Sequence, residues 1–361
     1  MVNINLITYG CTANQDNSAI IKGILTSKGH NIVESPSKAD IIIINTCIVK
    51  GVTANKVRSA IGRFRHKRLI IAGCMAESEQ KLLKKIAPNA SLVNTFHITE
   101  ISSIVNSTLN NKICILNGKR KEEKLSLPKI FKNNKAIIQI SEGCTSSCTF
   151  CETKLAKGHI TSYPEVSIVS ELKNYIKQGH KFINITSTDN GCYGLDIGTS
   201  LPALLKRLVS VQGSFQLRIG MMNPQHVKLF LKDLIDVYKS PKIIKFLHIP
   251  LQSGSNKVLK EMNRHYTTND FKHIINEFRK SIPGISISTD IIVGYPTENE
   301  KDFNQTIKLI KETKPDVLNI SKFAPRPRTR ASKLKQLPTE LIKDHSRILT
   351  KEFKKIKKKK I

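Results

Sequence analysis

Short runs of β-branched residues alternate with longer helical patterns along the first hundred residues of the chain. Strand-like runs cover residues 2–8, 40–45 and 68–72, and helix-like segments cover residues 14–28, 51–65 and 77–86. Strands that alternate with helices in this way form parallel sheets whose faces the helices cover. The pattern therefore predicts an α/β domain at residues 1–116, with a doubly wound parallel sheet.

The alternation stops at residues 117–135, which are rich in Lys, Glu, Ser and Asn and have little periodicity, and this segment is predicted to be a linker. The alternation then resumes over residues 136–335. Six strand-like runs cover residues 136–141, 182–187, 215–219, 245–249, 285–293 and 316–320. This number of strands suits a partial or complete β/α barrel, whose chemistry lies at the C-terminal ends of the strands. An open doubly wound sheet fits the same pattern.

Residues 336–361 are predicted to form one amphipathic helix followed by a lysine-rich tail. Residues 351–360 hold seven lysines and one glutamate, a charge density too repulsive for a packed core. The tail is expected to be disordered until it meets an anion.

The charge balance points to a polyanionic partner. The chain has 59 Lys and Arg against 28 Asp and Glu, a net charge of +31, which is far more than solubility needs. Such an excess of positive charge favours nucleic acid as the partner. A source organism whose proteins are generally rich in lysine would produce a similar composition. The chain has no run of about 18 uncharged apolar residues that would span a membrane.

The start of the chain enters a strand-like run directly, without the basic and apolar segments of an export signal. A cytoplasmic location is therefore expected, in which the eight cysteines stay reduced. Clustered cysteines in such a protein are more often metal ligands than disulfides.

Three cysteines lie close together directly after the first strand of the second domain. The run Ile140-Ser-Glu-Gly-Cys144-Thr-Ser-Ser-Cys148-Thr-Phe-Cys151 has the spacing Cys-x-x-x-Cys-x-x-Cys. Three thiolates can bind three irons of a [4Fe-4S] cluster, and they leave the fourth iron open to a substrate or cofactor. A zinc site is the alternative, but structural zinc sites usually have a fourth ligand, for which His159 is the nearest candidate.

A second set of cysteines is dispersed, but each member ends a strand-like run of the first domain. Cys11, Cys47 and Cys74 follow Thr-Tyr-Gly, Ile-Asn-Thr and Ile-Ala-Gly. In a parallel sheet these positions share one edge, where such folds bind ligands. Three converging thiols predict a second incomplete cluster, whereas the alternative is three small buried residues. Cys114 and Cys192 belong to neither set of cysteines and are assigned no metal role.

These residues carry a family resemblance. The three clustered cysteines resemble the radical S-adenosylmethionine (SAM) signature, and the dispersed three resemble those of the methylthiotransferases, a radical SAM family with a second cluster. Further matches in order along the chain are Asn45-Thr-Cys47, His248-Ile-Pro-Leu-Gln-Ser-Gly254, Met262-Asn-Arg-His-Tyr266 and Asp290-Ile-Ile-Val-Gly-Tyr-Pro296. The resemblance implies a radical SAM partial β/α barrel for the second domain.

The resemblance also implies the chemistry. SAM would bind the open iron of the Cys144, Cys148 and Cys151 cluster and give methionine and a deoxyadenosyl radical, which abstracts hydrogen from an adenine carbon that no side-chain base could deprotonate. The cluster of the dispersed cysteines would deliver sulfur as a methylthio group. The reaction needs tRNA as substrate, an electron donor and a sulfur source.

Three motifs are most similar to the archaeal and eukaryotic branch of the family. They are Glu142-Gly-Cys144, Thr153-Lys-Leu-Ala-Lys-Gly158 and Ser187-Thr-Asp-Asn-Gly-Cys-Tyr-Gly194. That branch acts at carbon 2 of N6-threonylcarbamoyladenosine at tRNA position 37. The bacterial branches act on isopentenyladenosine or on a ribosomal-protein aspartate. The alternative to an enzyme of this family is a zinc-containing RNA-binding protein that catalyses no reaction.

The chain departs from the family pattern in two places. Family members commonly end in a small RNA-binding β-barrel called TRAM, and no five-strand pattern for it is recognised here. The family's Pro-Arg-Pro-Gly-Thr is Pro325-Arg-Pro-Arg-Thr329 in this sequence. The arginines Arg326, Arg328 and Arg330 alternate with prolines in a stiff segment that is expected either to grip tRNA phosphates or to be a solvated linker.

Residues that contact SAM are expected at the ends of the barrel strands. Asp189, Gln252 and Asp290 are the polar candidates there. Loop capping or a satisfied buried polar network is the alternative role for each of the three.

Overall fold

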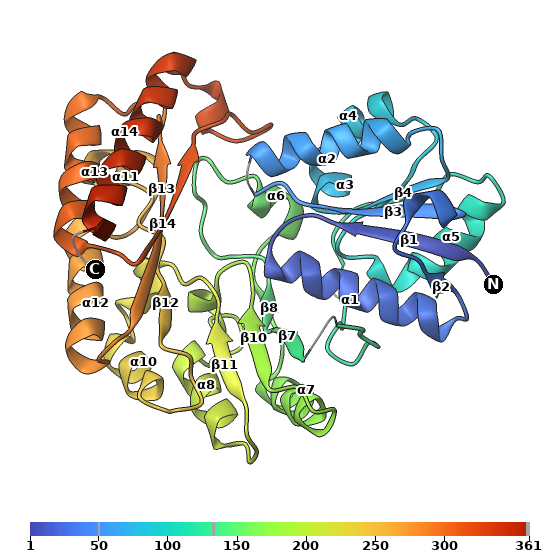
Figure 1. Ribbon diagram of the computed structural model, residues 1–361, viewed down its shortest axis with the longest axis horizontal. Coiled ribbons are helices and arrows are strands. Elements are labelled where there is room, and N and C mark those ends of the chain that lie inside the picture. Colours follow the sequence, from blue (N-terminus) through green and yellow to red (C-terminus); the bar gives the residue numbers. More distant parts are fainter. Residues whose placement is uncertain (50, 121, 132–133, 359–361) are drawn as a thin grey trace.

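The computed structural model describes residues 1–49, 51–120, 122–131 and 134–358. Two α/β units follow one another along the chain (Figure 1), and the linker between them lies along α1 of the first unit. Within the described residues, no helix has the length and apolar character needed to cross a membrane.

The first unit is a six-stranded sheet in the order β2-β1-β3-β4-β5-β6, and all its strand pairs are parallel. Its strands are β1 (Asn3–Thr8), β2 (Asn31–Ile32), β3 (Ile41–Thr46), β4 (Leu69–Gly73), β5 (Ser91–Val93) and β6 (Ile115–Leu116). Its helices are α1 (Thr12–Ser27), α2 (Gly51–Phe64), α3 (Cys74–Ser78), α4 (Gln80–Ile86) and α5 (Ile101–Leu109). The predicted doubly wound parallel sheet is confirmed.

Helices cover both faces of this sheet because successive strand residues point to opposite sides. On β3, Ile42 and Ile44 pack into one core with residues of α2, and Ile41 and Ile43 pack into a second core with residues of α1 and α5. All four isoleucines are fully buried. A central strand buried on both faces explains why residues 40–45 lack the polar alternation of a solvent-facing strand.

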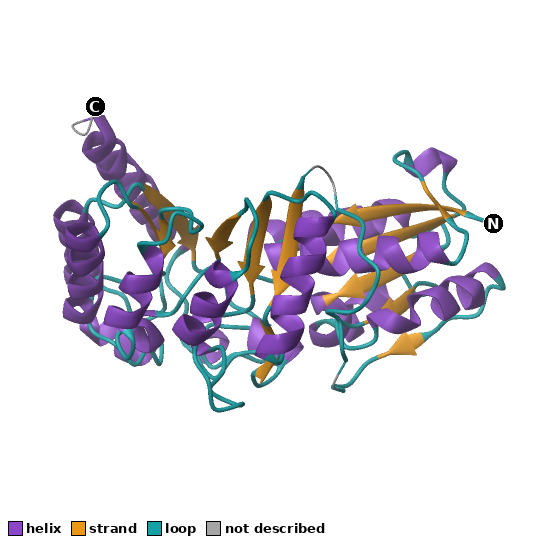
Figure 2. Ribbon diagram, turned by 90° about the horizontal axis from the view of Figure 1, so that it is seen from below, coloured by secondary structure: helices purple, strands orange, loops and turns teal. Residues whose placement is uncertain are grey.

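Six parallel strands of the second unit form two three-stranded sheets, β11-β10-β7 and β12-β13-β14. They are β7 (Lys135–Gln139), β10 (Phe182–Thr186), β11 (Gln216–Ile219), β12 (Phe246–His248), β13 (Ser286–Val293) and β14 (Val317–Lys322). A parallel bridge from Leu217 to Ile243 and a hydrogen bond from Met222 N to His248 O connect the two sheets. The strands thus form one curved row, open on the side between β7 and β14 (Figure 2), which is the predicted partial barrel.

Helices surround this row on its outer side (Figure 2). They are α7 (Glu165–Lys177), α8 (Leu201–Ser210), α9 (Pro224–Val227), α10 (Leu231–Tyr238), α11 (Asn256–Glu261), α12 (Thr268–Ser281), α13 (Glu300–Thr313) and α14 (Thr339–Lys358). Helix α6 (Thr153–Lys157) lies instead against the first unit, where its Ala156 joins a buried cluster. Capping boxes begin α12, with Thr267 and Asp270, and α13, with Asn299 and Asp302. A short antiparallel pair, β8 (Ser141–Glu142) and β9 (Thr161–Ser162), brackets the loop that contains the clustered cysteines.

The expected disorder of the lysine-rich segment is wrong as far as Lys358, because α14 continues through it. Ion pairs from Glu352 to Lys311 on α13 and to Lys355 on α14 offset part of the repulsion. The apolar side of the helix packs on the barrel through Leu349, Phe353 and Ile356. Residues 359–361 of the predicted tail lie outside the described residues.

The linker packs closely along α1. Ile130 N donates to Ala19 O of α1, and Lys129 forms buried ion pairs with Asp16 of α1 at 3.3 Å and Glu171 of α7 at 3.2 Å. Helix α3 of the first unit packs against α6 of the second (Figure 1). These contacts bring the cysteine-bearing edge of the sheet close to the cysteine loop of the barrel.

Candidate metal centres

The three dispersed cysteines converge at one edge of the first sheet. Cys11 follows β1 and immediately precedes α1, Cys47 follows β3, and Cys74 follows β4 as the first residue of α3. Parallel strands bring their carboxyl ends to the same edge, so the register of β1, β3 and β4 brings the three together. The dispersed set of the sequence is therefore one site in space.

The thiols of this set are close enough to perturb one another. A hydrogen bond with Cys47 lowers the pKa of Cys11 to about 6 and raises that of Cys47 above its usual range. Burial raises the pKa of Cys74 to about 11, and Cys11 acts in the same direction. Cys11 is exposed, whereas Cys47 and Cys74 are buried. The set thus has one exposed member, through which a ligand can enter.

The backbone approaches these thiols closely. Gly10 has φ +116°, and a Cβ at this position would lie 2.6 Å from the Cys47 sulfur. The Asn14 amide donates to Tyr9 O at 2.9 Å and Thr46 O at 2.6 Å, which ties the loops after β1 and β3 together. Three converging soft ligands in a fixed frame fit a [4Fe-4S] cluster with an open iron.

The clustered cysteines lie on the loop between β8 and α6, at the C-terminal side of β7. Cys148 accepts a hydrogen bond from Arg264 Nη1 at 3.2 Å, and Cys144 accepts one from Ser146 N at 3.3 Å. Burial raises the pKa of Cys151, and the neighbouring Cys148 raises it further. Donors directed at the sulfurs stabilise thiolates, so this loop also fits a cluster with three cysteine ligands.

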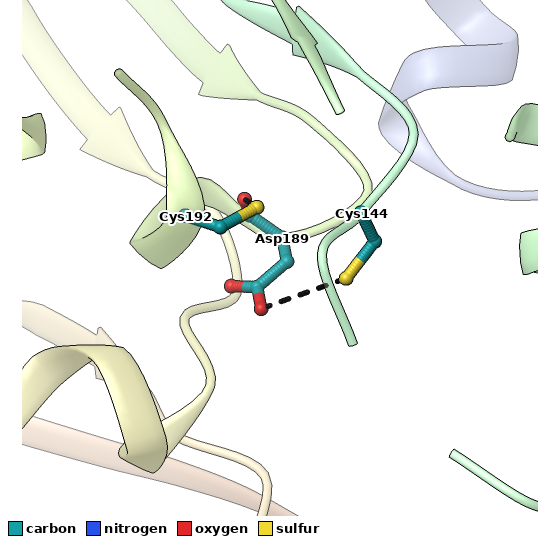
Figure 3. A group of neighbouring side chains, drawn as sticks. All are labelled: Cys144, Asp189 and Cys192. Carbon is teal, nitrogen blue, oxygen red and sulfur yellow. Dashed lines mark hydrogen bonds between the residues drawn. The ribbon is translucent and has the colours of Figure 1, made fainter. Parts of the chain in front are cut away.

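Cys192 lies next to this loop, which the sequence did not indicate. The ligand atoms of Cys144, Asp189 and Cys192 all lie within 4.8 Å of one another (Figure 3). A hydrogen bond with Cys192 lowers the pKa of Cys144 to about 7. Cys192 also donates to Asp189 O at 3.1 Å. Only its position three residues after Asp189, in a loop after a barrel strand, could have pointed to this place.

Arg264 is a second residue that sequence reasoning missed as a site residue. Besides Cys148, its guanidinium donates to Asn223 Oδ1 at 2.9 Å and Tyr266 OH at 3.1 Å. Burial lowers the pKa of Arg264, but Tyr266 and Cys148 raise it above its usual range, so the side chain carries a permanent charge beside Cys148. The run Met262-Asn-Arg-His-Tyr266 contained the signal, because buried arginine needs a nearby anion.

The predicted SAM residues occupy different surroundings. Asp189 is buried and accepts hydrogen bonds from Gly191 N and Asn223 N, both at 3.0 Å, as a capping residue does. Gln252 N donates to Asp290 O at 2.8 Å, which places these two residues side by side. Asp290 also pairs with His248 at 2.6 Å, and both side chains are partly exposed. The roles of Asp189, Gln252 and Asp290 toward SAM remain predictions.

The three arginines after β14 differ in exposure. Arg326 is buried. Arg328 is exposed, but it donates to Ser78 O of α3 at 3.0 Å, so this segment contacts the first unit. Arg330 is exposed. Of the three, Arg330 therefore has the freest side chain for a phosphate, and contact of all three with tRNA remains a prediction.

Arg328 has φ +62°, a left-handed conformation that suits the glycine of the family pattern. We expect Arg328→Gly to change the free energy of unfolding little, because relief of about 1 kcal/mol of backbone strain offsets a lost hydrogen bond of about 1 kcal/mol. Arg328→Ala loses the bond and keeps the strain, so it should be about 1 kcal/mol less stable than Arg328→Gly. Urea unfolding of both variants checks this order, and equal midpoints would contradict it.

Comparisons with known proteins identify the class of protein to which this chain is similar. Residues 138–310 match the model of the Radical SAM superfamily, and residues 3–95 match that of the uncharacterized protein family UPF0004. The solved structure of the radical S-adenosylmethionine methyltransferase TsrM from Kitasatospora setae, with cobalamin and a [4Fe-4S] cluster bound, superposes with a TM-score of 0.67 at 12% identity. The match covers 91% of this chain and 77% of TsrM, and it shows a shared fold.

The particular family follows from curated relatives. The probable threonylcarbamoyladenosine tRNA methylthiotransferase of Pyrococcus horikoshii is 39% identical over 97% of this chain and 83% of the relative. The human threonylcarbamoyladenosine tRNA methylthiotransferase is 37% identical over 96% of this chain and 61% of the relative. The chain belongs to this family of radical SAM methylthiotransferases. The resemblance drawn from the motifs is thereby confirmed, and a zinc protein without catalysis is set aside.

Proposed function

We propose that the protein inserts a methylthio group at carbon 2 of N6-threonylcarbamoyladenosine at position 37 of tRNA. The proposal follows the names of relatives from archaea and vertebrates that align over nearly the whole chain. The observation in the structure that carries it is the presence of two separate sets of three cysteines, brought together by the packing of α3 on α6.

In this proposal each set holds one [4Fe-4S] cluster. Cys144, Cys148 and Cys151 hold the cluster that binds SAM, and Cys11, Cys47 and Cys74 hold the other. When bound, the first cluster with SAM supplies radical chemistry at an unreactive carbon, and the second supplies sulfur. Helix α3 begins with Cys74, and α6 begins two residues after Cys151, so the contact between these helices fixes the two sets relative to each other.

The surrounding residues have separate tasks. Arg264 neutralises the Cys148 thiolate, and its bond to Asn223 fixes the guanidinium. The partly exposed pair His248 and Asp290, next to Gln252, offers donors and acceptors for the polar groups of SAM. The net charge of +31 attracts the phosphates of tRNA. Eight free thiols are compatible with a reducing cytoplasm, where we place the enzyme.

The test is mass spectrometry of nucleosides from tRNA incubated anaerobically with the reconstituted enzyme and SAM. Dithionite serves as the electron donor and sulfide as the sulfur source. A methylthio increment on threonylcarbamoyladenosine is the expected result. tRNA that lacks the threonylcarbamoyl group, and tRNA with isopentenyladenosine, serve as matched substrates that should stay unmodified.

Two results would redirect the proposal. Methylthiolation of the isopentenyladenosine tRNA would assign the enzyme to another branch of the family. Unmodified tRNA together with free deoxyadenosine would retain the radical enzyme and refute tRNA as the acceptor.

A further inference from the structure

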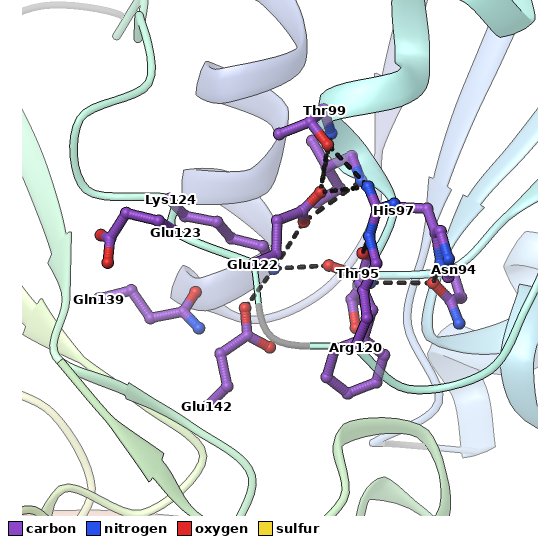
Figure 4. Close-up of polar contacts among 12 residues, drawn as sticks. Asn94, Thr95, His97, Thr99, Arg120, Glu122, Glu123, Lys124, Gln139 and Glu142 are labelled. Carbon is purple, nitrogen blue, oxygen red and sulfur yellow. Dashed lines mark hydrogen bonds and ion pairs between the residues drawn. The ribbon is translucent and has the colours of Figure 1, made fainter.

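A chain of buried charges connects the two units beside the cysteine sets. The Glu142 carboxylate forms ion pairs with Lys124 and, at 2.9 Å, with Lys157. Lys124 also donates to Thr95 O at 2.5 Å, so it connects the first unit to the barrel (Figure 4). The side chains of Lys124, Lys157 and Glu142 are 2%, 4% and 7% exposed. Buried charges are expensive, so such a group calls for a reason beyond stability.

Helix α6 places Lys157 near the dispersed cysteines, because it packs against α3 and its Ala156 lies in the same buried cluster as Cys74. Burial lowers the pKa of Lys157, but Glu142, Cys74 and Cys11 outweigh that effect and raise it above its usual range. In turn, the Lys157 charge acts to lower the pKa values of Cys11 and Cys74. Lys124 acts more weakly on Cys74. The buried Lys157 ammonium thus pairs with Glu142 and also acts on the thiols of the first unit.

Helix α6 places this charge with precision. It begins two residues after Cys151, and its Lys154 donates to the backbone carbonyl of Cys144. Lys157 lies at the other end of the same helix, and this helix packs against α3 of the first unit, which begins with Cys74. Helix α6 therefore contacts the loop of the clustered cysteines through Lys154 and carries the Lys157 ammonium on the side of the dispersed cysteines.

We propose that Lys157 is a positioning residue whose ammonium is the counter-charge of the cluster held by Cys11, Cys47 and Cys74, and of the anionic sulfur carried there. This inference rests on the proposed function. Iron-sulfur clusters with thiolate ligands carry negative charge, and their reduction potential depends on nearby charge and solvent exposure. A desolvated cation favours the reduced cluster and holds an anionic sulfur ligand until it is transferred.

The Glu142 carboxylate balances part of the positive charge of the two buried lysines. Burial would raise the pKa of Glu142, but Lys124 and Lys157 hold it at about 2, so it stays ionised. Because two ammonium groups share this one carboxylate, loss of either lysine still leaves Glu142 paired. Single lysine variants are therefore expected to fold, which makes the charge testable.

The experiment measures the reduction potential of the second cluster alone. Full-length Cys144→Ala/Cys148→Ala/Cys151→Ala lacks all three thiols of the barrel loop, so reconstitution with iron and sulfide should load only the set of Cys11, Cys47 and Cys74. In that background an EPR-monitored redox titration compares Lys157→Met, Lys157→Arg and Lys124→Met with the parent. We expect Lys157→Met to shift the potential to more negative values, because the added electron loses a buried cation that acts on its thiol ligands. Lys157→Arg should stay close to the parent.

Lys124→Met is the matched control, because it removes the other ammonium from Glu142. It should shift the potential less than Lys157→Met does. Equal shifts in these two variants, no shift in Lys157→Met, or the same shift in Lys157→Arg would overturn the proposal. If a variant does not assemble the cluster, its iron content is the readout. Loss of iron from Lys157→Met but not from Lys157→Arg would support the proposal. Loss of iron from both variants would overturn the proposal. None of these measurements uses tRNA. They therefore test the role of Lys157 even if the acceptor of the methylthio group is not tRNA.

Discussion

Cys148→Ala is expected to abolish reductive cleavage of SAM, whereas Cys47→Ala is expected to leave SAM cleavage intact and to remove the methylthio product. The reason is the separation of the two cysteine sets between two folded units. Cys148 is on the barrel loop, where Arg264 contacts its sulfur at 3.2 Å. Cys47 follows β3 of the first unit, where its thiol forms a hydrogen bond with Cys11. On the proposed assignment of the two sets, each variant removes one of three ligands from one cluster only.

Two assays check this prediction on the same anaerobic samples. Free deoxyadenosine, measured by liquid chromatography, reports SAM cleavage, and nucleoside mass spectrometry reports the product. Cys114→Ala is a suitable control, since Cys114 belongs to neither set and is only partly buried. It should retain both activities. Loss of SAM cleavage in Cys47→Ala would show that the clusters do not work separately.

The fold could be predicted from the sequence where strands are long and buried. The run at residues 40–45 became β3, the central strand that separates two cores. The two-residue strands β2 and β6 and the three-residue β5 were missed, because so few residues carry no period. Helix α5 was also missed in the sequence analysis, and the predicted helix at residues 77–86 is two helices, α3 and α4.

The cysteine sets could be located because their positions depend on strand ends and on local spacing. Helix α14 was misjudged from residue 351 onward for a different reason. Lysine density predicted disorder, but the segment also carries Phe353 and Ile356, which pack on the barrel core. Ion pairs with Glu352 reduce the repulsion further. Tertiary contacts of this kind have no signature in local composition.

The contacts between sites were the least predictable feature. Cys192 beside Cys144, Arg264 on Cys148 and Lys157 near Cys74 each join residues that are far apart in sequence. Two of them are charged residues in motifs that the family resemblance had already selected. The roles of these residues follow from their burial and from the contacts between their side chains, which a single sequence does not report.

Gly143→Ala is expected to cost about 3 kcal/mol or more of folding free energy and to remove the iron of the SAM-type site. Gly143 has φ +72°, and a Cβ at this position would lie 1.9 Å from the His159 carbonyl oxygen. The obstacle is backbone, which the pairing of β8 with β9 holds on one side and the hydrogen bond from Cys144 N to Gly158 O holds on the other. The strand pair must therefore separate, and Cys144, the next residue, moves with it.

The matched control is Gly179→Ala, where φ is +85° and no atom lies within 4 Å of the added Cβ. This variant carries only the left-handed strain, about 1 kcal/mol. Urea unfolding separates the two costs, and iron analysis after reconstitution should give about half the parent's iron for Gly143→Ala and the full amount for Gly179→Ala. Equal stability of the two variants, with full iron in both, would mean that the β8–β9 pair yields freely. The Cys144 loop would then owe its shape to the cluster and not to the fold around it.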